Sequence, residues 1–179
     1  MDTPDPVTEP QAYQQALLSF LGDDDPATAQ GQTSTALHDI VDRAGGDLRT
    51  RPGPAEWSSL EAIAHIVQAE IVYSARYRWI VAHDEPPLIG YDQDLWVDRL
   101  HAGQDDPAIL LGVFDALRRS NIDLWNRSSD DERARVGMHG ERGPESFDLS
   151  FRLIAGHDRL HADQARRALD AVRSPVGSG

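Results

Sequence analysis

The sequence predicts an all-α protein whose main body is a four-helix bundle, preceded by a short N-terminal helix. Helix-start signals occur at four places along the chain, apolar residues recur at helical spacing after each of them, and the alternating pattern of strands is nearly absent. The 179 residues, 40% of them apolar, are enough for one domain with a single core.

The helices are placed by their first residues. Asp25 and Asp106 are N-cap residues that are each followed by a proline, whose missing N–H costs nothing at the first helical position. Ser58 and Glu61 match a capping box, and a fourth start lies near Ser146. With an amphipathic segment near the N-terminus, these signals predict helices over 9–21, 26–46, 58–83, 106–128 and 146–172.

Two connecting segments are longer than a tight helical hairpin needs. Residues 83–103 contain two prolines and Gly90, which predicts a long crossover between the second and third helices of the bundle, with one or two helical turns over 92–100. Residues 127–144 are predicted to form a polar loop that carries His139. The expected domain organisation is an N-terminal extension at 1–25, the bundle at 26–172 and a flexible tail at 173–179.

Charge and missing residue types narrow the chemistry. The chain has 17 basic residues, all arginine, 30 acidic residues, a formal charge of −13 and no cysteine. Without lysine or cysteine it has no Schiff-base amine, no thiolate nucleophile and no thiolate metal ligand. The acidic balance argues against nucleic acid as a partner, and no apolar run is long enough to span a membrane. We therefore expect a soluble, cytoplasmic protein.

The apolar stripe of the last helix contains two histidines. Phe147, Phe151 and Ile154 lead along this stripe to His157 and then to His161, one helical turn further on. Both imidazoles can therefore point at the same place, and helices use this spacing to chelate a divalent metal. A pair of hydrogen-bonded histidines in the core is the alternative.

His65 is a candidate third member of this group. It lies in the segment AIAHIVQAE, which is apolar almost all round and is therefore predicted to be buried. A buried imidazole needs a partner, because an unsatisfied polar group in a core costs about 1–3 kcal/mol. That partner is either a shared metal or a hydrogen bond from Asn121, the lone polar member of the apolar stripe on the third helix. The remaining histidines, His38, His83, His101 and His139, are expected to be solvated, and the alternative for His139 is a place at a pocket mouth or beside a ligand histidine.

Several segments together resemble the DinB/YfiT superfamily. They are PAEWSSLEAIAHIVQAE, DEPPL followed by YDQD and a tryptophan, HGERGP and AGHDRLHADQ, which occur in this order within residues 26–172. The resemblance implies a bundle with up-down-down-up topology. It also implies a divalent-metal site made by three histidines, one from the second helix and two from the fourth, and the matching positions here are His65, His157 and His161.

The resemblance also implies a class of activity. Characterised members include thiol transferases that use bacillithiol or mycothiol and a thiol-dependent maleylpyruvate isomerase, whereas many members have no known substrate. Because this chain has no cysteine, a thiol would be an external low-molecular-weight cofactor. We expect an enzyme that activates such a thiol or water at the three histidines to attack a small molecule. The alternatives are a metal-dependent hydrolase and a non-catalytic metal-binding module of a stress response.

The chemistry of such a site follows from its ligands. Three neutral imidazoles leave a metal its full charge and an open position, as in catalytic zinc sites, and zinc and nickel are the expected ions because imidazole suits both. Asp158, next to His157, is a candidate catalytic base, although we expect it to form a salt bridge on the helix surface. Each ligand histidine should donate its other ring N–H to an acceptor. The candidates near the site are Glu61, Gln68 and Asn121.

The expected partners are a small-molecule substrate and a second copy of the chain. The superfamily implies a homodimer, and aromatic residues outside the predicted apolar stripes, such as Tyr73 and Trp125, favour one as well.

Overall fold

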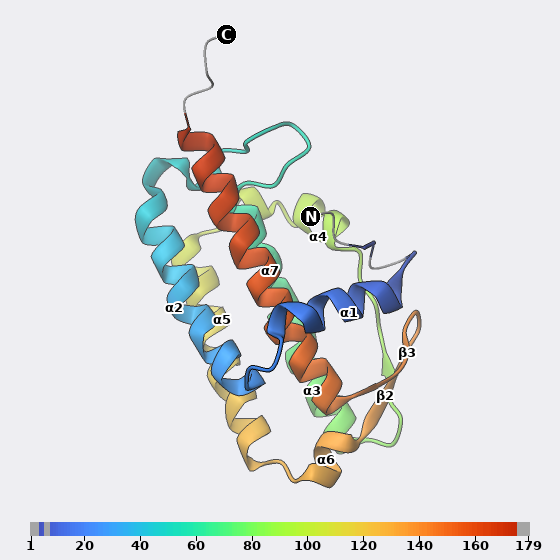
Figure 1. The fold of residues 1–179 in the computed structure, drawn as a ribbon. Helices are drawn as coiled ribbons and strands as arrows, with labels where there is room; N and C mark the ends of the chain where they lie inside the picture. The colour runs from blue at the N-terminus through green and yellow to red at the C-terminus, as the bar shows by residue number, and fades with distance from the viewer. Residues whose placement is uncertain (1–3, 6–7, 175–179) are drawn as a thin grey trace.

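A short helix lies across a four-helix bundle in this protein (Figure 1). The computed structural model describes residues 4–5 and 8–174. The long helices α2, α3, α5 and α7 run up, down, down and up in the view of Figure 1, which confirms the predicted topology. Their bounds are Pro26–Ala44, Ser59–Ala82, Pro107–Arg127 and Phe147–Arg173, and the short helix α1 covers Pro10–Leu21.

The predicted start signals cap the bundle helices. The side chains of Asp25, Asp106 and Ser146 each accept a hydrogen bond from a backbone N–H of the first turn that follows them. Ser58 and Glu61 form the complete capping box at the start of α3. A cap of this kind stabilises a helix by about 1 kcal/mol. Local sequence therefore determines where each bundle helix begins.

The chain between α3 and α5 forms the predicted long crossover. It contains the short strand β1 (Pro87–Leu88), the helix α4 (Gln93–Arg99) and a 3₁₀ turn (Ala102–Gln104). A second 3₁₀ turn, Gly45–Arg49, follows α2. Because the crossover returns from the end of α3 to the opposite end of the bundle, α3 and α5 can run in the same direction (Figure 1).

The prediction of a plain polar loop over 127–144 is wrong. This segment contains the helix α6 (Asp130–Ala134) and the strand β2 (Val136–His139), and β2 pairs antiparallel with β3 (Gly143–Ser146) and parallel with β1. Strands of two to four residues are too short for an alternating pattern to be visible in the sequence. Gly137 permits the pairing, because a Cβ there would lie 2.8–2.9 Å from the Leu88 side chain.

Helix α3 lies at the centre of the core, and all its residues from 59 to 70 are buried. Aliphatic side chains of α2, α3 and α5 fill one end of the bundle. Aromatic rings of α3, α5 and α7 fill the other end, where the Trp125 and Phe151 rings stack with centroids 4.2 Å apart. Tyr73 and Trp125 belong to this cluster and are only 8% and 7% exposed. They therefore supply no surface for a dimer, and this part of the expectation is wrong.

Helix α1 crosses α7 in direct backbone contact. A Cβ added at Gly156 of α7 would lie 1.9 Å from the carbonyl oxygen of Leu17 in α1. Only glycine allows two backbones to approach so closely. The N-terminal extension predicted at 1–25 is thus held against the bundle where the structure describes it.

Helix α7 ends at Arg173, and most of the predicted flexible tail at 173–179 lies outside the described residues.

None of the described helices combines the length and the apolar composition that a membrane span requires.

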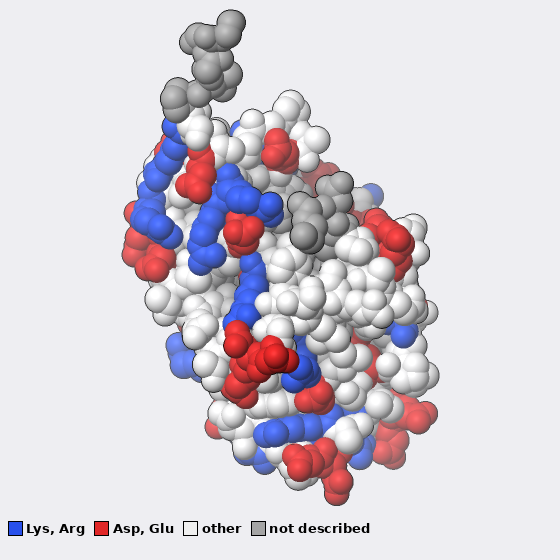
Figure 2. Space-filling view, in the orientation of Figure 1, with Lys and Arg blue, Asp and Glu red and all other residues white. Residues whose placement is uncertain are grey.

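Charged residues of both signs lie next to one another on the face shown in Figure 2. Two ion pairs join neighbouring segments of the surface, Arg159–Asp24 at 2.6 Å and Arg173–Asp47 at 2.9 Å, and Arg167–Asp163 at 3.1 Å links successive turns of α7. Exposed pairs of this kind contribute about 0–1 kcal/mol each. The stability of the fold therefore depends mainly on its buried contacts.

The substitution Gly156→Ala should separate α1 from α7. The new methyl group would overlap a backbone oxygen that has no side-chain freedom to move away, so we expect the free energy of unfolding in urea to fall by about 1–3 kcal/mol. Gly112→Ala is the matched control, because this exposed position in α5 has no atom within 4 Å of the added Cβ. There, alanine should raise the free energy of unfolding by about 0.5–1 kcal/mol. Equal effects of the two substitutions would contradict the close contact.

Candidate metal centre

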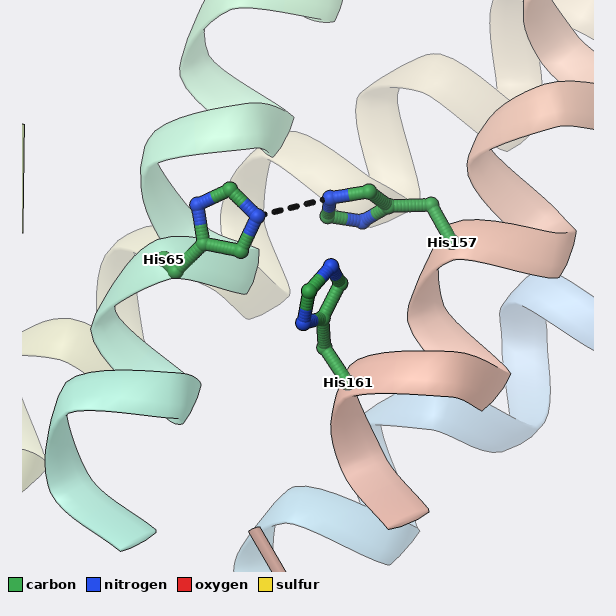
Figure 3. A group of neighbouring side chains, drawn as sticks. All are labelled: His65, His157 and His161. Carbon is green, nitrogen blue, oxygen red and sulfur yellow. Dashed lines mark hydrogen bonds between the residues drawn. The ribbon is translucent and has the colours of Figure 1, made fainter. Parts of the chain in front are cut away.

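Three histidines meet between α3 and α7 (Figure 3). His65 comes from the first half of α3, and His157 and His161 come from successive turns of α7. The Nε2 atoms of His65 and His157 are 2.9 Å apart. One nitrogen from each of the three rings lies within 4.8 Å of the other two. The structure therefore brings together the three residues that were predicted to share one site.

The three rings are buried and only partly hydrogen-bonded. The exposed fraction is 1% for His65 and 6% for His157 and for His161. Among the described residues, the Nδ1 atoms of His65 and His157 and the Nε2 atom of His161 have no hydrogen-bond partner. An unpaired buried polar group costs about 1–3 kcal/mol. The group is therefore destabilising by itself and is suited to binding something else.

Gln164 determines which nitrogen of His161 carries the proton. Its Oε1 atom lies 2.7 Å from Nδ1 of His161, and because this oxygen can only accept, Nδ1 donates. Nε2 then holds a lone pair, and Figure 3 shows a nitrogen of this ring turned toward the other two rings. One ring N–H held by an acceptor and the other nitrogen free is the usual state of a metal-binding histidine. The sequence analysis missed Gln164, although its spacing of three residues from His161 on one helix is the signal.

Burial keeps the imidazoles of His65 and His161 neutral. It lowers the pKa of His65 well below the usual value for histidine and lowers the pKa of His161 to about 3, and the neighbouring imidazoles act in the same direction. Both rings are therefore uncharged at neutral pH, in the form that binds a metal. A tetrahedral zinc ion about 2.0–2.1 Å from each nitrogen requires the nitrogens to be about 3.4 Å apart. The Nε2 atoms of His65 and His157 are 2.9 Å apart and one nitrogen of each ring lies within 4.8 Å of the others, so the distances bracket this value and the residues fit a divalent metal.

Trp57 covers one side of the group. The centroid of its ring lies 5.2 Å from that of His65 and 6.3 Å from that of His161. It directly precedes Ser58, so the turn that caps α3 also places the indole against the imidazoles. An apolar wall of this kind excludes water and strengthens electrostatic interactions inside the site.

A buried network of ion pairs lies behind His157. Arg118 of α5 donates hydrogen bonds to Glu70 of α3 and to Asp158 of α7, and these three side chains are at most 3% exposed. The expected salt bridge of Asp158 on the helix surface is therefore wrong, because its partner comes from another helix and lies in the core. Burial by itself raises the pKa of Asp158, but Arg118 and His157 together outweigh burial and hold that pKa below its usual value. Its Oδ1 atom lies 3.8 Å from Nδ1 of His157, where a carboxylate can orient the ring.

The other residues expected to accept a ring N–H from the histidines do not contact the rings. The Glu61 carboxylate is held by Arg51, and the Asn121 side chain donates to Glu70. Gln68 is buried, and its Oε1 atom has no partner among the described residues. None of the hydrogen bonds in the described part of the chain joins Glu61, Gln68 or Asn121 to a histidine of the group. These positions therefore stabilise the helices around the site rather than its rings.

Three neighbouring cavities border the histidines. A cavity of about 180 Å³ is bordered by His65 and His157, and His139 of β2 forms part of its wall. Two further cavities, of about 520 and 390 Å³, are bordered by His161. The expectation that His139 is solvated is wrong, because the side chain is only 3% exposed and lies in the wall of the first cavity. The cavities give small molecules room next to the rings.

Comparisons with known proteins identify the family and the fold. The sequence model of the DinB superfamily matches residues 28–165. Among solved structures, the fold is similar to that of YfiT from Bacillus subtilis, a protein described as a probable metal-dependent hydrolase with an unusual four-helix bundle topology. The TM-score is 0.72, the sequences are 14% identical, and the match covers 94% of this chain and 91% of YfiT. No curated protein gives a significant match.

The substitution Arg118→Met should strongly destabilise the protein. It leaves the carboxylates of Glu70 and Asp158 buried without their counter-charge, and removing one partner of a buried pair costs about 3–5 kcal/mol. Arg127→Met is the matched control, because Arg127 pairs with Asp123 on the surface, where both side chains are more than half exposed. We expect urea denaturation to show a change of about 0–1 kcal/mol for this control. A similarly small change for Arg118→Met would contradict the buried network.

Proposed function

This chain belongs to the DinB superfamily, and from that premise we propose that it is a metal-dependent enzyme that hydrolyses a small molecule. The observation that carries the proposal is the convergence of His65, His157 and His161, which are buried and lie beside cavities. The likeness of the fold to YfiT, the probable metal-dependent hydrolase, supports the same type of reaction.

His65, His157 and His161 would hold the metal, and zinc or nickel suits three imidazoles. When bound, the metal supplies Lewis-acid chemistry that lowers the pKa of a water or thiol at its open position. None of the three ligands is charged, so the ion would keep its full charge for this task. The chain contains no cysteine, so a thiol can only come from outside.

Other residues of the chain would position the ligands and protect them from bulk water. Gln164 holds the proton on Nδ1 of His161, and Asp158 lies beside Nδ1 of His157. Trp57 covers the rings of His65 and His161. Removing a residue that orients a metal ligand in this way typically lowers metal affinity by about 10–100-fold.

Transfer of a small external thiol is the second candidate function. It is favoured by the presence of more than one cavity at the histidines, one at His65 and His157 and the others at His161. A thiol and an electrophile could then occupy separate cavities beside the site. Hydrolysis needs only one organic substrate, whereas transfer needs two.

Metal content tests the site itself. We expect protein purified without chelators to contain about one divalent metal ion per chain by elemental analysis, and His161→Ala to lose it, because two imidazoles make a weak site. His83→Ala is the matched control, since His83 is exposed at the end of α3 and should leave the metal content unchanged. Metal-free wild-type protein that takes up neither zinc nor nickel would overturn the proposal.

Turnover with and without a thiol separates the two reactions. We expect the zinc- or nickel-loaded protein to hydrolyse a reactive ester such as p-nitrophenyl acetate without added thiol, and at least about tenfold faster than the metal-free protein. His161→Ala should have the rate of the metal-free protein. Activity only on a thiol and 1-chloro-2,4-dinitrobenzene together would support the transferase instead. Metal binding without either activity would support a non-catalytic metal-binding module.

A further inference from the structure

A buried arginine without a counter-charge lies in the cavity beside the histidines. Arg76 of α3 borders the cavity of about 180 Å³ that also touches His65 and His157, and Arg76 is only 2% exposed. No carboxylate in the described part of the chain forms an ion pair with it. The other arginines in similar positions are paired: Arg118 with Glu70 and Asp158, and Arg142 with Glu145. A buried charge is costly unless it is paired, so Arg76 requires an explanation.

The contacts of Arg76 hold the guanidinium in place without neutralising it. Its Nη2 atom donates a hydrogen bond to the carbonyl oxygen of Ile89 in the crossover. Its Cζ atom lies 4.7 Å from the centre of the Tyr73 ring. Its Nε atom is buried and has no partner among the described residues. The guanidinium is thus fixed in position with donor capacity left over.

His139 lies next to Arg76 in the wall of the same cavity and supplies a second hydrogen-bond donor. The Nδ1 atom of His139 accepts a hydrogen bond from the N–H of Glu141 at 3.2 Å. Burial, together with the nearby Arg142 and Arg76, lowers the pKa of His139 to about 4, so the ring is neutral at neutral pH. Its single proton therefore lies on Nε2, which is 3.3 Å from Nη2 of Arg76. Two donors meet there with no acceptor between them.

From this excess of donors we propose that the cavity binds a small organic carboxylate, with Arg76 as its counter-charge and His139 as a second hydrogen-bond donor. The guanidinium fork matches the two oxygens of a carboxylate. The inference rests on the proposed function only in that the carboxylate would belong to the substrate. Because a cavity of about 150 Å³ can bind benzene, this one fits a molecule of about that size.

The position of Arg76 along α3 suits this role. It lies 11 residues after His65, which is about three helical turns and about 16 Å along the axis, so both residues are on one face of the helix. A carboxylate held at Arg76 would extend the rest of the molecule toward His65. The acidic residues that also border the cavity, Asp5, Asp92, Asp94 and Glu141, are exposed, and water and salt screen them more than they screen Arg76.

The test measures binding of benzoate and of its uncharged analogue benzamide by calorimetry. Metal-free protein is used first, so that a carboxylate cannot bind to a metal ion instead. We expect benzoate to bind at least about tenfold more tightly than benzamide, and Arg76→Met to weaken benzoate binding by about tenfold or more. Arg76→Lys should retain part of the affinity, because it keeps the charge but loses the fork. Arg99→Met, an exposed position in α4, removes the same charge elsewhere and should have no effect.

Several outcomes would overturn the inference. These are equal binding of benzoate and benzamide, no benzoate binding at millimolar concentration, and unchanged binding to Arg76→Met. If Arg76→Met does not fold, the test rests on benzoate binding by Arg76→Lys and on the comparison of benzoate with benzamide for wild-type protein. Metal content, measured on separate samples purified without chelators, separates the two proposals: Arg76→Met should keep its metal. A protein that binds benzoate through Arg76 but takes up no metal would refute the proposed function and leave this inference standing.

Discussion

Helix α3 is buried all round over its first half, and this constraint determines much of the structure. A polar side chain on such a helix cannot turn to solvent, so it must find its partner on a neighbouring element or remain unpaired at a cost of about 1–3 kcal/mol. His65 faces the two histidines of α7, Glu70 faces Arg118 of α5, and Arg76 faces β2 and the crossover. The polar groups of one helix thereby fix its position relative to three neighbours.

Helix α7 is held in the same way by three consecutive residues. Gly156 contacts the backbone of α1, His157 faces His65 of α3, and Asp158 pairs with Arg118 of α5. Successive residues of a helix point about 100° apart, so a single turn of α7 contacts three different helices. A rotation or shift of α7 would break all three contacts together. The histidines therefore rest on rigid helices, which hold a site more precisely than loops do.

The helices and the group of histidines could be predicted from the sequence because both depend on residues that are close together in the chain. Caps mark where the helices begin, and the apolar stripe shows that His157 and His161 share one face. The burial of Asp158 could not be predicted in this way, because the sequence around it does not reveal a partner on α5 that is 40 residues away. The small sheet was missed for a similar reason: β1 and β2 pair across the crossover and α5, and each strand is too short to carry a pattern.

In the proposed function, the charge around the histidines would favour an anion as the substrate. The nearest carboxylate, Asp158, already shares its charge with Arg118. A divalent ion held by three neutral imidazoles would therefore keep most of its positive charge, and Arg76 adds a second unpaired positive charge at the same cavity. The chain as a whole carries a formal charge of −13, so its acidic surface tends to repel anions. In both proposals, only a small molecule that enters the cavity would gain both attractions, so size and charge would act together in selecting the substrate.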